Sequence, residues 1–176
     1  MMIEGLNIEA AMIASVSPDK TKLLVYDFYG VARLYPADSS QAYLELRHGA
    51  SIEDARWSPD GRWIVTGGKD GRLVMWDAQT GEMVWERTAH TNRLYWLAWS
   101  PDGTRIATAS YDSTAQVWSS DGTLITSMTE HRAELFAINW SPDGEQLCTT
   151  SQDRTARLWD AQTGETHHVL TGHGGW

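Results

Sequence analysis

The feature that most constrains this chain is a tripeptide, Ser-Pro-Asp, that recurs along it at nearly even spacing. It begins at residues 17, 58, 100 and 141, so the spacings are 41, 42 and 41 residues. A period of about 40 residues is typical of stacked repeats, in which each unit buries its faces against its neighbours. The spacing therefore predicts four copies of one structural unit in a single domain over residues 1–176.

The third copy indicates how one unit is built. Ser100-Pro101-Asp102-Gly103 has the composition of a type I turn, because proline presets φ at its second position and glycine accepts the left-handed conformation that follows. Short apolar or alternating segments surround this turn, and no segment keeps a helical period. We expect strands over residues 94–99, 105–109, 114–118 and 124–128.

The other copies have the same pattern, although the first fits it more weakly. The predicted fold class is all-β: four four-stranded antiparallel blades of a β-propeller, forming half of a larger ring. The approximate blade boundaries are residues 7–47, 48–89, 90–130 and 131–172.

Composition excludes several function classes. A net charge of −9 argues against a nucleic-acid binder or a protein that binds acidic membrane surfaces, because both need a basic footprint. The first twenty residues lack the basic region of a secretory signal, and no apolar run is long enough to cross a bilayer. A single cysteine, Cys148, fits a cytoplasmic location, and its apolar neighbours predict a buried, unreactive thiol.

Tryptophan is unusually common, with ten residues against two phenylalanines. Three of them precede a Ser-Pro-Asp turn, and three more end the predicted third strand of a blade. Their repetition predicts core positions rather than a sugar-binding surface. These six are Trp57, Trp99, Trp140, Trp76, Trp118 and Trp159.

Polar residues recur with the same period. Each of three copies has a histidine ten residues before the Ser-Pro-Asp serine, a threonine four residues before a turn aspartate, and a tryptophan six residues after it. A buried Trp N–H needs an acceptor and a buried His needs a fixed tautomer, so we expect one hydrogen-bond network in each blade. The sets are His48, Thr66, Asp70 and Trp76; His90, Thr108, Asp112 and Trp118; and His131, Thr149, Asp153 and Trp159.

This arrangement resembles the WD-repeat β-propeller family over residues 7–173. The family's Trp-Asp dipeptide is present at Trp76-Asp77 and Trp159-Asp160, whereas the third copy has Trp118-Ser119. Its Gly-His pair is matched only at Gly172-His173. The resemblance implies that the polar sets are structural and that the chain is a non-catalytic protein–protein interaction scaffold without a cofactor.

The first copy departs from the pattern. Asn7, Val25, Tyr29 and Tyr35 stand where the other copies have the polar set, and its turn is Ser-Pro-Asp-Lys. Either this copy is degenerate or its surroundings differ, and the second interpretation is favoured because an end blade meets something other than an identical neighbour.

The same residue types could also form a catalytic site or a metal site. A His, an Asp and a hydroxyl residue also make a catalytic triad, but three copies at one period do not suit an enzyme. His167, His168 and His173 form a small cluster, yet neighbouring residues in a strand point to opposite faces and no further ligand completes the set. We therefore expect neither a catalytic site nor a metal site.

Exposed residues that do not repeat are the candidates for partner binding. The resemblance implies that three positions in each blade lie on the narrow top rim, unless some of these side chains pack inside the channel. Aromatic and arginine side chains dominate binding hot spots. The expected partner-binding residues are Arg93, Tyr95, Trp96, Tyr111, Phe136, Phe28 and Met12.

Four blades pose a problem of closure, because two apolar end faces would remain in water. Two chains could close the ring as an eight-bladed homodimer. Alternatively, the end blades could dock on a different protein in a hetero-assembly. The homodimer is favoured over the hetero-assembly, and the less favoured alternatives are a fragment of a longer protein and a closed four-bladed monomer. The end residues suit either a strand that pairs with a partner or a fragment. Two further functions stay open: a regulatory or sensor part of a larger signalling protein, and a propeller that binds carbohydrate or another small ligand.

Overall fold

The computed structural model describes residues 11–38 and 43–172, with the backbone alone for residues 11–14. The described residues form strands and turns without helix, so no helix in this part of the chain meets the length and hydropathy of a membrane span. The strands form four separate four-stranded antiparallel sheets, each a simple meander in chain order. The predicted all-β fold with four four-stranded antiparallel blades is therefore confirmed.

The strand bounds follow the repeat closely. The first sheet contains β1 (Ala11–Val16), β2 (Lys22–Asp27), β3 (Val31–Pro36) and β4 (Leu44–Arg47). The second contains β5 (Ile52–Trp57), β6 (Trp63–Gly68), β7 (Arg72–Asp77) and β8 (Met83–Thr88). The third contains β9 (Leu94–Trp99), β10 (Arg105–Ser110), β11 (Ala115–Ser119) and β12 (Leu124–Met128). The fourth contains β13 (Leu135–Trp140), β14 (Gln146–Ser151), β15 (Ala156–Asp160) and β16 (Thr166–Leu170).

The Ser-Pro-Asp turns join the first and second strands of each sheet. In the third sheet the Gly103 N–H donates to the Ser100 carbonyl at 2.9 Å, and Gly103 has the expected positive φ of 70°. The Ser100 hydroxyl accepts from the Arg105 N–H at 2.9 Å, which fixes the start of β10. In the first sheet Lys20 has a φ of 63° at the glycine position, so the same turn forms with a non-glycine residue.

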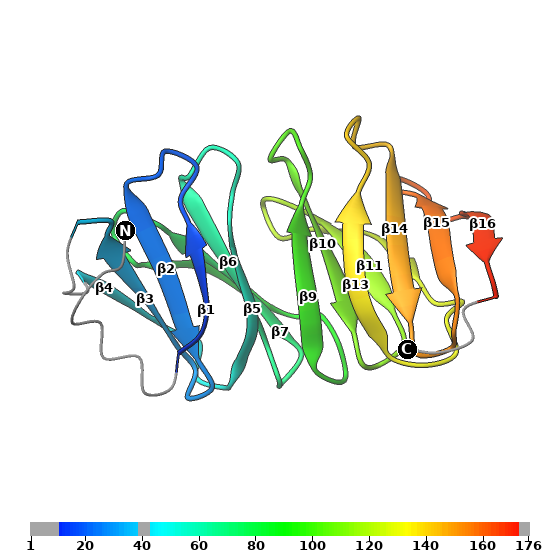
Figure 1. The fold of residues 1–176 in the computed structure, drawn as a ribbon, viewed down its shortest axis with the longest axis horizontal. Coiled ribbons are helices and arrows are strands. Elements are labelled where there is room, and N and C mark those ends of the chain that lie inside the picture. Colours follow the sequence, from blue (N-terminus) through cyan, green and yellow to red (C-terminus); the bar gives the residue numbers. More distant parts are fainter. Residues whose placement is uncertain (1–10, 39–42, 173–176) are drawn as a thin grey trace.

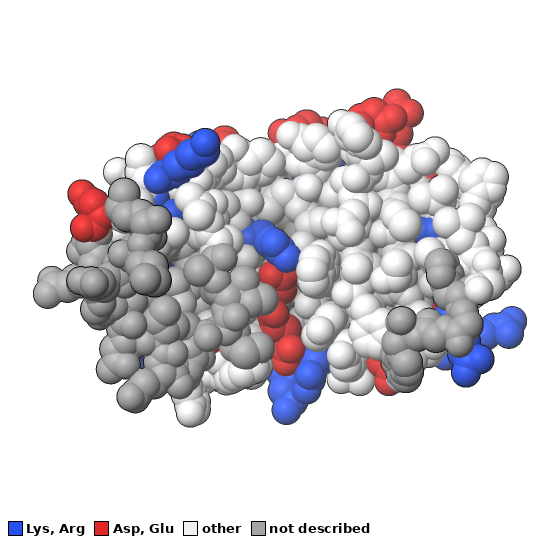
Figure 2. Space-filling view, in the orientation of Figure 1, with Lys and Arg blue, Asp and Glu red and all other residues white. Residues whose placement is uncertain are grey.

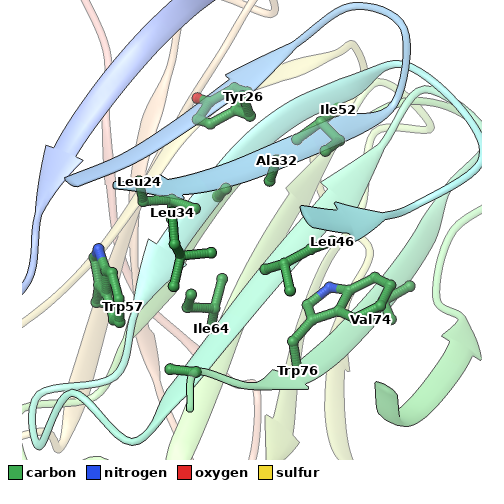
Figure 3. Close-up of a cluster of buried hydrophobic side chains, with 12 residues drawn as sticks. Leu24, Tyr26, Ala32, Leu34, Leu46, Ile52, Trp57, Ile64, Val74 and Trp76 are labelled. Carbon is green, nitrogen blue, oxygen red and sulfur yellow. The ribbon is translucent and has the colours of Figure 1, made fainter. Parts of the chain in front are cut away.

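The sheets lie side by side, with the first and the last at opposite ends of an open arc (Figure 1). Each neighbouring pair buries one apolar layer, because alternate residues of a strand point to opposite faces. Between the first two sheets, Leu24 and Leu34 pack against Ile64 and Trp76, all nearly fully buried (Figure 3). The described sheets do not close into a ring.

The tryptophan prediction is confirmed for four of the six positions, which are at most 8% exposed: Trp57, Trp76, Trp118 and Trp159. Trp99 and Trp140 are half-buried and pack against the layers on either side of the third sheet. The expectation of a buried Cys148 is wrong. Its side chain is half-exposed, because it lies on the face of the fourth sheet that has no further sheet packed on it.

Candidate functional site

The polar network is complete in the fourth sheet. The Trp159 Nε1–H donates to the Thr149 hydroxyl at 2.8 Å, and that hydroxyl lies 2.7 Å from His131 Nε2. His131 Nδ1 lies 2.7 Å from Asp153 Oδ2, so the ring donates from Nδ1 and accepts at Nε2. The buried hydroxyl thus joins Trp159 to His131, and the histidine ring extends the network to Asp153.

The third sheet keeps the same ring orientation but lacks one link. His90 Nε2 lies 2.8 Å from the Thr108 hydroxyl, and its Nδ1 lies 3.0 Å from Asp112 Oδ2. The Trp118 Nε1–H is buried and has no hydrogen-bond partner. The expected four-residue network is therefore a three-residue network here.

In the second sheet the histidine ring is reversed. His48 Nδ1 lies 2.8 Å from the Thr66 hydroxyl, which also accepts from Trp76 Nε1 at 2.9 Å, while His48 Nε2 is 3.4 Å from Asp70. Arg72 holds the Asp70 carboxylate through a 2.5 Å contact from Nε. The other two sheets have a threonine in place of this arginine, so their aspartate stays close to the histidine.

Burial sets the protonation of the networks in the second and fourth sheets. It lowers the pKa of His48 and of His131, and the nearby aspartates oppose this only in part. Burial alone would raise the pKa of Asp153, but hydrogen bonds from Thr155 and His131 outweigh it and hold that pKa well below its usual value. A neutral histidine beside an ionised aspartate is the result.

The threonine of each set is fully buried, with 0% of its surface exposed in all three sheets. A buried hydroxyl bonded to Trp or His cannot meet a substrate, so the geometry of these sets is structural. Among the described residues no group of three or more His, Cys, Asp or Glu side chains converges as a metal site. His173 of the terminal histidine cluster lies outside the described residues, and the side chains of His167 and His168 are both exposed.

The candidate binding site is a cluster on one rim of the arc, formed by Arg93, Tyr95, Tyr111 and Phe136, which we call the rim cluster. The ring centroids of Tyr95 and Tyr111 are 5.0 Å apart, and Phe136 meets both rings edge-on at 6.2 and 6.0 Å. The Arg93 guanidinium lies over Tyr111, 5.3 Å from its centroid. All four side chains are half-exposed and come from two adjacent sheets.

A β-bulge places the side chains of this rim. The first strand of every sheet breaks register at its second residue, which has no cross-strand partner in the ladder. A bulge re-aims the unpaired residue out of the regular alternation. In chain order the bulged residues are Met12, Glu53, Tyr95 and Phe136.

Glu53 belongs to this site although the sequence did not single it out for binding. Its carboxylate lies 3.3 Å from Arg93 Nε, and only 8% of its side chain is exposed. Burial raises the pKa of Glu53, while Arg93 and Lys69 act in the opposite direction. The ion pair links the second sheet to the third and holds the guanidinium against Tyr111.

Phe28 and Trp96, two of the other predicted partner-binding residues, are not part of the rim cluster. Phe28 is 48% exposed in the turn between β2 and β3 of the first sheet. Trp96 packs against the core layer between the third and fourth sheets, with the Arg56 guanidinium 5.0 Å from its ring. The side chain of Met12 lies outside the described residues.

Trp63, Trp85 and Trp96 do not form a grouped platform on which a carbohydrate could stack. Trp63 and Trp85, like Trp96, each have an arginine guanidinium over the ring, at 4.5 Å for Arg62 and 5.5 Å for Arg87. Trp85 also donates to the Ser120 carbonyl of the next sheet at 3.0 Å. These rings contact their own chain rather than standing open for a sugar to stack on.

Asp54 is a structural residue that the sequence analysis missed. It is 3% exposed, and its carboxylate accepts from the Leu97 N–H of the next sheet at 2.9 Å. Tyr26 of the preceding sheet donates to it at 3.3 Å, and Arg56 pairs with it at 3.1 Å. One buried carboxylate thus joins three sheets. The only signal in the sequence is that the other first strands have an apolar residue here.

Comparison with known proteins agrees with this architecture. The family model "WD domain, G-beta repeat" matches residues 42–77, 81–119 and 122–160. The chain belongs to the WD40 family. Each matched repeat begins near the outermost strand of one sheet and ends with the third strand of the next, so the sequence repeat is staggered relative to the sheet. The family supports a protein-interaction scaffold as the general role of the chain.

Curated relatives match over short segments. Protein tipD of Dictyostelium discoideum is 48% identical over 40 residues, which is 23% of this chain and 6% of that protein. The F-box-like/WD repeat-containing protein TBL1X of Mus musculus is 33% identical over 64 residues, 36% of this chain and 12% of that protein. Actin-interacting protein 1 of Drosophila melanogaster is 34% identical over 82 residues, 46% of this chain and 14% of that protein. The matched segments thus span a small part of each relative.

Proposed function

We propose that this chain is a non-catalytic interaction module whose rim cluster binds a protein or peptide partner. The observation that carries the proposal is the convergence of three aromatic rings and an arginine, from two sheets, on one half-exposed surface. Tyrosine and arginine contribute most often to binding hot spots, because they combine large contact area with hydrogen-bonding groups.

The rim cluster is also preorganised. The Glu53–Arg93 ion pair and the contacts among the rings hold the side chains before any partner arrives. A rigid surface loses less conformational entropy when it binds, which favours affinity. The partner we propose is a folded protein or peptide with an apolar side chain for the rings and an acceptor for Arg93.

The open end faces of the arc suggest a second kind of contact, in which another β-blade packs on them. This blade comes either from a second copy of the chain or from a different subunit of an assembly. The charge of −9 supports partners other than nucleic acid or acidic membranes, and the single cysteine supports a cytoplasmic setting.

The test is a binding screen of the chain against a displayed peptide library, followed by the double variant Tyr95→Ala/Phe136→Ala. We expect selected peptides to lose at least about 30-fold in affinity, since hot-spot truncation costs ~2 kcal/mol or more. Tyr43→Ala is the matched control, because Tyr43 is an exposed tyrosine beside β4, away from the rim cluster. Unchanged affinity in the double variant would remove the rim cluster as the binding site.

A further inference from the structure

The three junctions between neighbouring sheets follow one pattern, and it predicts what covers the two end faces. Each sheet has one face that points toward the following sheet in the chain and one face that points toward the preceding sheet. At each junction, a face of the first kind packs on a face of the second kind. In the second and third sheets the first kind of face is buried: Val65, Met75, Ala107, Val117 and Met128 are at most 2% exposed. A following sheet is thus the normal cover of such a face in this molecule.

The fourth sheet has this face without a cover, and we call it the trailing face. Cys148 and Leu158 occupy the positions of Ala107 and Val117 in the ladder, and both are half-exposed. Leu170 takes the position of Met128 and is 48% exposed. The trailing face therefore has the apolar residues of a junction and lacks the sheet that would bury them.

The first sheet has the opposite kind of face without a cover, and we call it the leading face. Leu23 occupies the position of Ile64, which is fully buried, yet Leu23 is half-exposed. Val16 stands at the position of Trp57 and is 55% exposed. The arc thus ends in one face of each kind, and the two kinds pack on each other at all three internal junctions.

Orientation and charge allow one partner to meet both faces. In Figure 1 the first and fourth sheets both turn their uncovered face toward the viewer, with their neighbours behind them. Figure 2, in the same orientation, shows mostly uncharged atoms over the middle of the fourth sheet, with charged groups toward its two ends. The leading face does carry charge, because Arg33 lies on the same face as Leu23 and pairs with Asp27 at 2.8 Å and with Glu45 at 3.1 Å. The mostly uncharged trailing face sets no like charge against this paired cluster.

A polar contact at the junction between the third and fourth sheets also has its counterpart at the ends. Arg105 Nη2 donates to the Gly144 carbonyl of the following turn at 2.7 Å. Gln146 occupies the position of Arg105, and Lys20 occupies that of Gly144 with a similar positive φ of 63° against 73°. The Gln146 amide, which now lies 3.4 Å from His167 Nδ1, can donate to the Lys20 carbonyl of another chain.

We propose that the trailing face binds the leading face of a second copy of this chain, and that two such junctions close an eight-sheet ring of two chains. Because a two-fold rotation exchanges the chains, each trailing face covers one leading face and no end face stays uncovered. This inference rests on the proposed interaction function and names one of its partners. It concerns a surface separate from the rim cluster, so each can fail alone.

The test is the solution mass of the 176-residue chain by light scattering on a sizing column. We expect twice the single-chain mass for the unmodified chain, and the single-chain mass for Leu158→Arg, Leu170→Arg and Leu23→Arg. Leu124→Arg is the matched control, because Leu124 is 45% exposed on β12 away from both end faces, and it should keep the doubled mass. Circular dichroism identifies any variant that does not fold. If Leu158→Arg does not fold, Leu170→Arg tests the trailing face in its place.

A mixing experiment identifies the partner face. Leu158→Arg and Leu23→Arg chains, mixed, still have one intact trailing face and one intact leading face, so a two-chain species should return. A single-chain mass for the unmodified chain would overturn the proposal. It would also be overturned if Leu23→Arg kept the doubled mass, since the trailing faces would then be pairing with each other. Peptide binding that is sensitive to Tyr95→Ala/Phe136→Ala would survive either result, which separates this failure from that of the proposed function.

Discussion

Replacing the central threonine of the polar network should cost more stability in the fourth sheet than in the third. Thr149→Val keeps the side-chain volume but removes the hydroxyl that accepts from Trp159 and bonds to His131. Two buried polar groups then lose their partner. At about 1–3 kcal/mol for each unsatisfied group, we expect the free energy of unfolding to fall by about 2–6 kcal/mol.

Thr108→Val is the internal comparison, because the Trp118 N–H already lacks a partner in the third sheet. His90 Nε2 loses its hydrogen bond there, and the Gln116 carbonyl loses only a long one of 3.5 Å, so the expected loss is about 1–3 kcal/mol, roughly half as large. The two substitutions are chemically identical and both sites are fully buried. Their difference therefore reports the tryptophan link by itself.

Urea unfolding followed by tryptophan fluorescence and circular dichroism measures both losses, and coincident transitions would justify a two-state treatment. Thr88→Val, at an exposed position of β8, is the control and should change stability by no more than about 0.5 kcal/mol. If Thr108→Val were as destabilising as Thr149→Val, the hydrogen bond from Trp159 would contribute nothing and the reasoning would be refuted.

Two further predictions concern titration and the junction between sheets. The folded-state pKa values of His131 and Asp153 lie below 6.5 and 3.8, so the unfolded chain binds more protons. The free energy of unfolding should then decrease as pH falls below 6.5 and decrease again below 3.8, and a flat profile between about pH 7 and pH 5 would contradict this. Asp54→Ala should lower the free energy of unfolding by about 1–3 kcal/mol, because the Leu97 N–H loses its acceptor. Asp54→Asn keeps an acceptor oxygen and should lose less in the same urea titration; an equal loss would rule out this bond as the cause.

The strands were predictable because their causes are local. The third sheet begins at Leu94 and ends at Met128, as the turn residues and the apolar spacing predicted, and its inner bounds differ by one residue. Proline and glycine restrict φ within a turn whatever surrounds it. The grouping of Arg93, Tyr95, Tyr111 and Phe136 followed from the resemblance to WD repeats, which implies that these positions share one rim. That these residues bind a partner stays a prediction.

Contacts between sheets were not predictable in the same way. Nothing near His48 in the sequence indicates that its ring is reversed, because the cause is Arg72, which draws Asp70 away. No role for Asp54 was predicted from the sequence, because that role depends on Tyr26 and Leu97, which lie in two other sheets. Such residues are distant in the chain and meet only when the sheets pack.

By itself, the sequence determined the number of repeats, the strand order within each sheet and the residues of the polar sets, since turn chemistry and a two-residue alternation act over a few positions. Only the tertiary structure decided which hydrogen bonds those sets complete, that bulges carry Glu53 and Tyr95 to the same rim, and that Leu158 and Leu23 are left without the sheet that would bury them. The reason is physical. A side chain's burial and its hydrogen-bond partners are properties of the packed sheets, and packing depends on which face meets which.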